Sequence, residues 1–140
     1  MNNYKKKYNS NDHNKEYDEN YLKNNILKIS IMKEDYDNYI DNAKKYAKWL
    51  KENGLSTSQI RKVYSDIKYT QTSIELKRLR PKLAYIIGRN SSNRGIRSFL
   101  NILDCGLKKL NIEEDINEIN SIKEFAETIV AYLKYYGDKE

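Results

Sequence analysis

The chain has 140 residues, enough for one domain with an apolar core but short for two. It is basic overall, with 26 Lys and Arg against 20 Asp and Glu, a formal net charge of +6. One proline and five glycines leave few breaks for a many-turned β fold, whereas segments of helical period run on uninterrupted. The sequence therefore predicts an all-α fold: a mostly disordered tail at residues 1–30, then a single domain at 31–140, a compact bundle of about five helices.

The same features argue against a secreted or membrane protein. A single cysteine cannot form an intramolecular disulfide, which favours a reducing compartment. The longest apolar cluster, Leu83–Ile87, is far shorter than the roughly 20 residues of a membrane span. Lys5–Lys7 is not followed by the apolar segment of a signal peptide. We expect a cytoplasmic protein with no membrane partner.

The first expected elements follow the tail. Residues 1–30 are rich in Asn, Lys, Tyr and Asp and show no sustained period, apart from a short apolar docking segment at 26–31. A helix is predicted at about 33–53, because apolar residues recur every three or four positions. Gly54 is the expected left-handed residue after its end. The inward face of this helix comprises Tyr36, Ile40, Ala43, Ala47 and Leu50.

A second helix is predicted to begin at Ser56, which forms a capping box with Gln59. Its apolar stripe is flanked on one side by Arg61 and Lys68, seven positions apart. The apolar residues of the stripe are Ile60, Val63, Tyr64 and Ile67.

The segment Ser73–Arg89 is predicted to form a third helix with two different sides. One side is apolar, and the other carries a basic stripe within about 60° of the helical wheel. Pro81 removes a backbone donor and should kink the helix near 77–80. The stripe consists of Arg78, Lys82, Tyr85 and Arg89, and the apolar side of Leu76, Leu79, Leu83, Ile86 and Ile87.

Two more helices complete the predicted bundle. After a loop at 90–95, a helix at about 96–110 buries Phe99, Leu100 and further leucines. The acidic run 113–115 is expected at a loop or helix start, where the helix dipole favours negative charge. A last helix is predicted from a capping box of Ser121 with Glu124.

Charge is unevenly distributed along the chain. Residues 44–109 carry 16 basic and 4 acidic side chains, and all six arginines lie there. Residues 110–140 carry 3 basic and 8 acidic side chains. An AT-rich coding bias would explain scattered lysines but not this concentration of arginine. Because Arg suits phosphate recognition, we interpret the middle of the chain as a polyanion-binding surface.

Residues capable of catalysis or metal binding are sparse. His13 lies in the predicted tail, and Cys105 has no histidine or thiol partner nearby in the sequence, so we interpret it as a packed residue of its helix. Asp66 and Asp104 are isolated carboxylates, expected to pair with neighbouring cations. We therefore predict a non-catalytic protein with no metal site and no cofactor.

Two other functions fit parts of the pattern. The helix at 33–53, the short turn at 53–56 and the helix that follows have lengths suited to a helix-turn-helix DNA-binding regulator. The basic residues continue well beyond that unit, which favours a polyanion track. A structural helical adaptor, whose basic face meets an acidic protein, is the third possibility.

Two motifs resemble a known family. Gly54–Asp66, G-L-S-T-S-Q-I-R-K-V-Y-S-D, and Leu79–Arg89, L-R-P-K-L-A-Y-I-I-G-R, are similar to segments of the small subunit of the type III-A CRISPR (Csm) effector complex. That family carries L-[ST]-T-S-Q-I-R and L-K-P-K-L-A-Y-A-A-G-R at similar separation. Here Ile86 and Ile87 stand in place of alanines, and Arg80 in place of lysine. The resemblance covers about 46–133.

The resemblance implies a role in antiviral defence. It implies a helical bundle present in several copies, stacked head to tail as a filament beside the other subunits of the effector complex. It also implies contact with the guide RNA–target RNA duplex, with cleavage assigned to other subunits. Such a subunit should contact RNA backbone, because base pairing reads the sequence. The acidic C-terminal block facing a neighbour's basic block is one candidate for the stacking contact. The predicted RNA-binding residues are Arg61, Lys62, Lys68, Arg78, Lys82, Arg89, Arg94 and Arg97.

Overall fold

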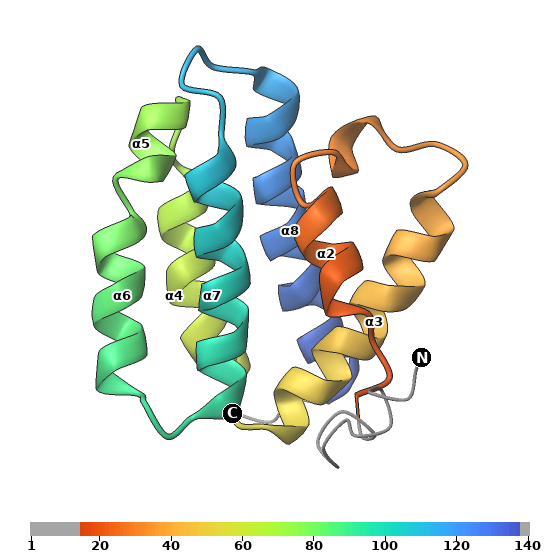
Figure 1. Ribbon diagram of the computed structural model, residues 1–140. Helices are drawn as coiled ribbons and strands as arrows, with labels where there is room; N and C mark the ends of the chain where they lie inside the picture. Colours follow the sequence, from red (N-terminus) through yellow and green to blue (C-terminus); the bar gives the residue numbers. More distant parts are fainter. Residues whose placement is uncertain (1–14, 138–140) are drawn as a thin grey trace, which may run out of the picture.

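The computed structural model describes residues 15–137, and over this range it is all-helical, as predicted (Figure 1). Five of its helices have ten or more residues, and shorter helical segments lie among them. In chain order the elements are α2 (Glu19–Asn25), the 3-10 helix η2 (Ile29–Ile31), α3 (Tyr36–Glu52), α4 (Thr57–Lys68), α5 (Ser73–Lys77), α6 (Arg80–Arg89), α7 (Arg94–Lys109) and α8 (Ile116–Tyr135).

Helix α8 is the centre of the bundle. It packs against η2, α3 and α4, while α7 packs against α3 and α6 and receives the short helices α2 and α5. The stacked rings of Phe99 and Phe125, 5.8 Å apart, join α7 to α8 in the core. In Figure 1, α4, α6 and α7 lie on one side of α8, and α2 and α3 on the other. The basic residues of α4 and α6 are therefore concentrated on one side of the molecule.

The N-terminal part of the bundle differs from the prediction. The expected disorder is wrong for residues 15–30, which contain α2 and part of η2 and contribute buried side chains to the core. The Tyr17 ring lies 4.6 Å from that of Tyr46 on α3, and Leu22 and Ile26 are almost fully buried. A few well-placed apolar residues hold this segment although its composition is polar. Residues 1–14 lie outside the described residues.

The two predicted capping boxes had different outcomes. At Ser56 the prediction is confirmed, since its hydroxyl accepts from the Gln59 amide and its own amide donates to Gln59 Oε1. The box at Ser121 is wrong, because α8 begins five residues earlier and is capped by Asp115. Ser121 lies inside the helix, fully buried, and its hydroxyl accepts from the Ser30 amide at 2.8 Å.

A close backbone contact fixes the start of α7. The Gly95 amide donates to the Asn53 carbonyl at 2.8 Å, and a Cβ at Gly95 would lie 2.9 Å from the Leu50 carbonyl oxygen. Only glycine allows the helix to approach the α3–α4 turn this closely. Gly54 in the same turn has φ +106°, as expected of the residue after a helix end. This contact sets the position of the arginines at the start of α7.

Candidate nucleic-acid interface

The basic residues of α4 lie on two different sides of the helix. Arg61 and Lys68 share the side that carries Tyr64, and the Lys68 ammonium lies 5.9 Å from that ring. Lys62 and Asp66, four residues apart, share the side that faces α6, because Asp66 pairs with a lysine of α6. Arg61, Lys62 and Lys68 are all exposed. The α4 residues therefore divide into two groups.

The predicted kink at Pro81 is a complete break between two helices. Helix α5 ends at Lys77, Arg78 and Leu79 keep right-handed backbone angles, and α6 begins at Arg80. Pro81 lies in the first turn of α6, where its missing amide leaves no helical hydrogen bond unmade. The break falls where the sequence predicted it.

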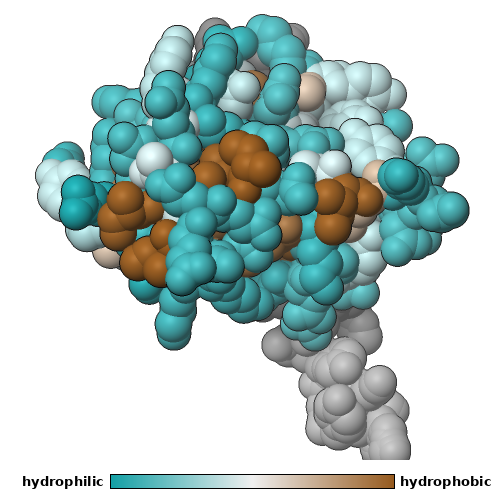
Figure 2. Space-filling view, turned by 90° about the horizontal axis from the view of Figure 1, so that it is seen from above, coloured by the Kyte–Doolittle hydropathy of each residue, from teal (hydrophilic) through white to brown (hydrophobic). Residues whose placement is uncertain are grey.

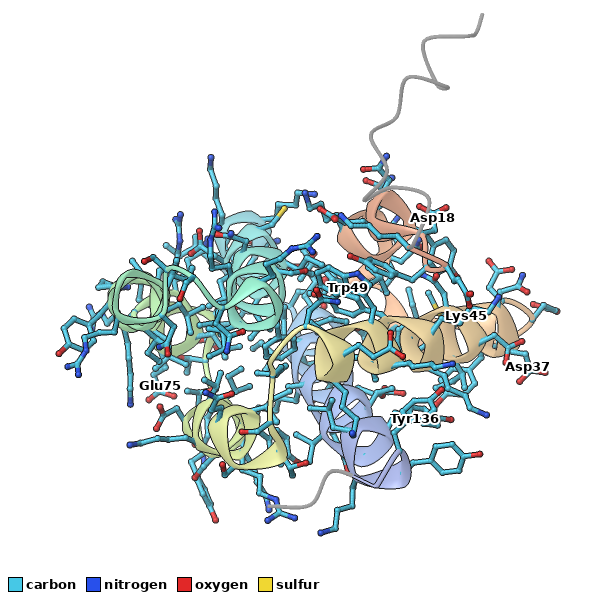
Figure 3. The ribbon with its side chains drawn as sticks, turned by 90° about the horizontal axis from the view of Figure 1, so that it is seen from below. Asp18, Asp37, Lys45, Trp49, Glu75 and Tyr136 are labelled. Carbon is cyan, nitrogen blue, oxygen red and sulfur yellow. The ribbon has the colours of Figure 1, made fainter. Side chains whose placement is uncertain are left out.

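All four residues of the predicted basic stripe are exposed: Arg78, Lys82, Tyr85 and Arg89. Arg89 Nη1 donates to the Tyr85 hydroxyl at 2.9 Å, and its guanidinium carbon lies 5.7 Å from the Tyr85 ring centroid. Tyr85 is itself 63% exposed. Seen from below in Figure 3, α6 is the outermost helix on its side of the molecule. The stripe is thus presented to solvent, with Arg89 oriented by Tyr85.

The two isolated carboxylates form the expected ion pairs. Lys82 Nζ lies 2.5 Å from Asp66 Oδ2 and links α6 to α4. Arg80 donates to both oxygens of Asp104 on α7, at 2.6 and 3.2 Å. Hydrogen bonding to Asp104 also raises the pKa of Arg80 above its usual value. Arg80 is therefore engaged within the fold.

The arginines at the start of α7 lie apart from the α6 stripe. The Arg94 guanidinium is 5.5 Å from the ring of Trp49 on α3, and the Lys15 ammonium is 5.4 Å from the same ring. Trp49 lies toward α7 and the middle of the molecule (Figure 3). Arg97 is exposed and donates to the Ser91 carbonyl at 3.4 Å. These arginines belong to a second basic surface near the α3–α4 turn.

The predicted residues therefore do not form one continuous track. Lys62 lies on the side of α4 that faces α6 and its stripe, Arg61 and Lys68 occupy the other side of α4, and Arg94 stacks on Trp49. Sequence reasoning missed the Trp49 cluster, because Lys15 lay in the predicted tail. It also missed Tyr69, which is 74% exposed with the Lys68 ammonium 5.8 Å from its ring. The adjacency of Tyr69 to Lys68 in the sequence was the signal that could have indicated this aromatic residue.

Metal ligands and reactive side chains are sparse in the part of the chain that the structure describes. Among residues 15–137 no group of three or more His, Cys, Asp or Glu side chains could hold a metal ion. Cys105 is a free, half-buried residue of α7, and His13 lies outside the described range. None of the described helices is long and apolar enough to cross a membrane.

These features define the class of protein: a small helical bundle whose exposed basic residues gather on α4, α6 and the start of α7. A family model described as Csm2 Type III-A matches residues 33–139. The chain therefore belongs to this family, the small subunit of the multi-subunit type III-A CRISPR (Csm) effector complex. Searches of curated proteins and of solved structures gave no match.

Proposed function

We propose that this chain is a non-catalytic, RNA-binding subunit that contacts the backbone of the guide RNA–target RNA duplex. The observation that carries the proposal is the exposed stripe Arg78, Lys82, Tyr85 and Arg89, with Lys62 on the side of α4 that faces it. Arginine and lysine at this density bind phosphate through charge and release of counterions. A backbone-reading surface suits a subunit that must accept any target sequence.

The ion pair within this surface does not block phosphate binding. Lys82 and Asp66 are both partly exposed, and an exposed pair contributes at most about 1 kcal/mol. A phosphate oxygen can therefore replace the Asp66 carboxylate at Lys82 with little loss of stability. Arg78 and Arg89 make no ion pair with any described carboxylate, so their charge is fully available.

Head-to-tail stacking of several copies is the second part of the proposal. One end of the molecule, seen from above in Figure 2, carries several apolar patches in a mostly hydrophilic surface. Exposed isoleucines occur in η2, α5, the α7–α8 connection and the first turn of α8, all at this end in Figure 1. Exposed Glu113 and Glu114 lie among them, and the opposite end carries Arg94 and Arg97. The exposed isoleucines of this end are Ile31, Ile74, Ile112 and Ile116. Apolar contact and opposite charge together support an end-to-end arrangement of the copies.

The test has two measurements. The full chain should bind an RNA duplex with an affinity that falls steeply with salt and varies little with sequence. Co-expressed with its neighbouring genes, it should co-purify with a guide-RNA complex. Absence from an otherwise intact complex would refute the proposal. A preferred DNA site would support the DNA-binding regulator, and binding of an acidic protein without RNA would support the adaptor.

A further inference from the structure

The surface between α4 and α6 contains an apolar hollow in the midst of charged residues. Helix α6 packs on α7 and α4 on α8, which leaves a space of about 140 Å³ where the three helices α4, α6 and α7 meet. Its walls are almost entirely hydrocarbon, formed by Val63, Ile86, Ile96 and Leu100. For comparison, a dry cavity of about 150 Å³ lined by apolar side chains accommodates a benzene ring. The hollow therefore has room for one six-membered ring.

The rim of the hollow is polar and basic. Lys62 is exposed at the rim and makes no ion pair with any residue of the described range. Gln59 Oε1 accepts from the Ser56 amide, so its Nε2 group is left to donate outward. Asn90 Nδ2 donates to the Ile86 carbonyl, which leaves its Oδ1 to accept. The rim thus offers one cation, one donor and one acceptor around an apolar floor.

We propose that this hollow binds a single unstacked nucleobase of an RNA strand. The phosphates of that strand would lie on the basic surface formed by Lys62 of α4 and Arg89 of α6. The inference rests on the RNA-binding function proposed above and adds a ligand site to it. A nucleotide matches the hollow in two respects, because it joins a flat ring with apolar faces to an anionic phosphate. Charge complementarity at the rim favours this occupant over an uncharged side chain.

The occupant must be a base outside a continuous helix. Both faces of a base within an A-form helix are covered by its neighbours, so only a turned-out or single-stranded base can enter. The volume fits a pyrimidine better than a purine. The amides of Gln59 and Asn90 can meet the hydrogen-bonding edge of such a ring, which would otherwise lose its water partners.

The first measurement uses the unaltered full chain. Its affinity should be compared for a short oligouridine, the same oligonucleotide with abasic sites throughout, an oligoadenosine and a continuous RNA duplex, at one salt concentration. We expect the abasic strand to bind about ten-fold more weakly than oligouridine, and oligoadenosine to fall between them. Equal affinity for the abasic and base-bearing strands would overturn the proposal, because phosphate contacts alone would then explain binding.

The second measurement fills the hollow. Ile86→Phe adds a ring at its wall, and Ala84→Phe adds the same ring at an exposed position of the same helix. We expect I86F to remove the preference for oligouridine over the abasic strand while duplex binding is kept, and A84F to retain both. Thermal unfolding of both variants checks the fold, and the first measurement stands without any substitution.

Other outcomes distinguish failure of the base site from failure of the proposed RNA-binding function. If no RNA binds the unaltered chain, the proposed RNA-binding function fails and the base site with it. If RNA binds but abasic strands bind equally well, only the base site fails. If I86F keeps the base preference, the base site is refuted. If that variant also no longer enters the effector complex, the hollow is instead a contact site for a partner subunit.

Discussion

Replacing Arg89 by alanine tests the basic stripe most directly. Arg89 is exposed, pairs with no described carboxylate and is held by the Tyr85 hydroxyl at 2.9 Å. Losing one phosphate contact should flatten the slope of log K against log salt by about 0.9 for a duplex and about 0.7 for a single strand. Affinity for duplex RNA should fall about five- to ten-fold at moderate salt, about 1–1.4 kcal/mol, with little dependence on sequence.

The matched control is Arg80→Ala. It removes the same unit of charge from the first turn of the same helix, but Arg80 donates two hydrogen bonds to Asp104, at 2.6 and 3.2 Å. A phosphate must compete with both bonds at Arg80, whereas Arg89 has no carboxylate partner among the described residues, so Arg80 should contribute less to phosphate binding. The assay is fluorescence anisotropy with labelled duplexes of two unrelated sequences between 50 and 200 mM salt, a range over which six phosphate contacts lose roughly 10³ in affinity. Equal losses for the two variants would show that net charge alone governs binding, and a strongly sequence-dependent loss for R89A would refute backbone recognition.

Three further predictions concern stability and assembly. Gly95→Ala should destabilise the fold by about 1–3 kcal/mol in urea unfolding, because the new methyl group meets backbone atoms at 2.9 Å. The control Gly88→Ala, whose methyl group meets open space, should stabilise α6 by about 0.5–1 kcal/mol. Similar effects of the two substitutions on the free energy of unfolding would contradict the close contact at the start of α7. Burial, and then the charge of Glu127, raises the pKa of Glu124 above its unfolded value, so its ionisation at neutral pH opposes folding. Glu124→Gln should therefore stabilise the protein at pH 7 by about 0.2–0.5 kcal/mol. This gain in stability should shrink as the pH falls through the folded-state pKa of Glu124 and should be absent below its unfolded-state pKa. A gain that does not depend on pH would contradict this reasoning. Ile116→Glu should weaken self-association, measured by sedimentation. The fold should not lose stability, since the Ile116 side chain is 59% exposed at a helix start that favours negative charge. Unchanged self-association would exclude this end of the molecule as the stacking contact.

Local signals in the sequence predicted most of the helices. Ser56 and Gln59 lie next to each other in the folded chain because they are three residues apart, so their capping box could be inferred without the fold. Pro81 acts through its own backbone and therefore marked the break between α5 and α6. The same pattern failed at Ser121, because a serine followed by a glutamate three residues later also occurs inside helices, and Asp115 caps α8 upstream.

Features that depend on distant segments were not predictable in this way. The segment 15–30 is polar on average, and its order depends on Tyr17 packing against Tyr46 and Trp49 of another helix. Helical periodicity predicted that Lys82, Tyr85 and Arg89 lie on one side of a helix, and all three belong to α6, whereas Arg78 lies between α5 and α6. It could not place Arg94 on Trp49, which requires the close approach of Gly95 to the α3–α4 turn. The hollow between three helices has no sequence signal of its own.

The central position of α8 has a consequence for how the protein is made. The helix nearest the C-terminus covers the inner faces of η2, α3 and α4, and Ser30 reaches across 91 positions of sequence to Ser121. Contacts this distant in sequence are slow to form, because a long loop must close first. On the ribosome, at about 5–20 residues per second, the earlier helices emerge with their apolar faces uncovered until α8 follows. The bundle therefore completes its core only after α8 has been synthesised, and any nascent chain that stops before α8 exposes the surfaces that cause aggregation.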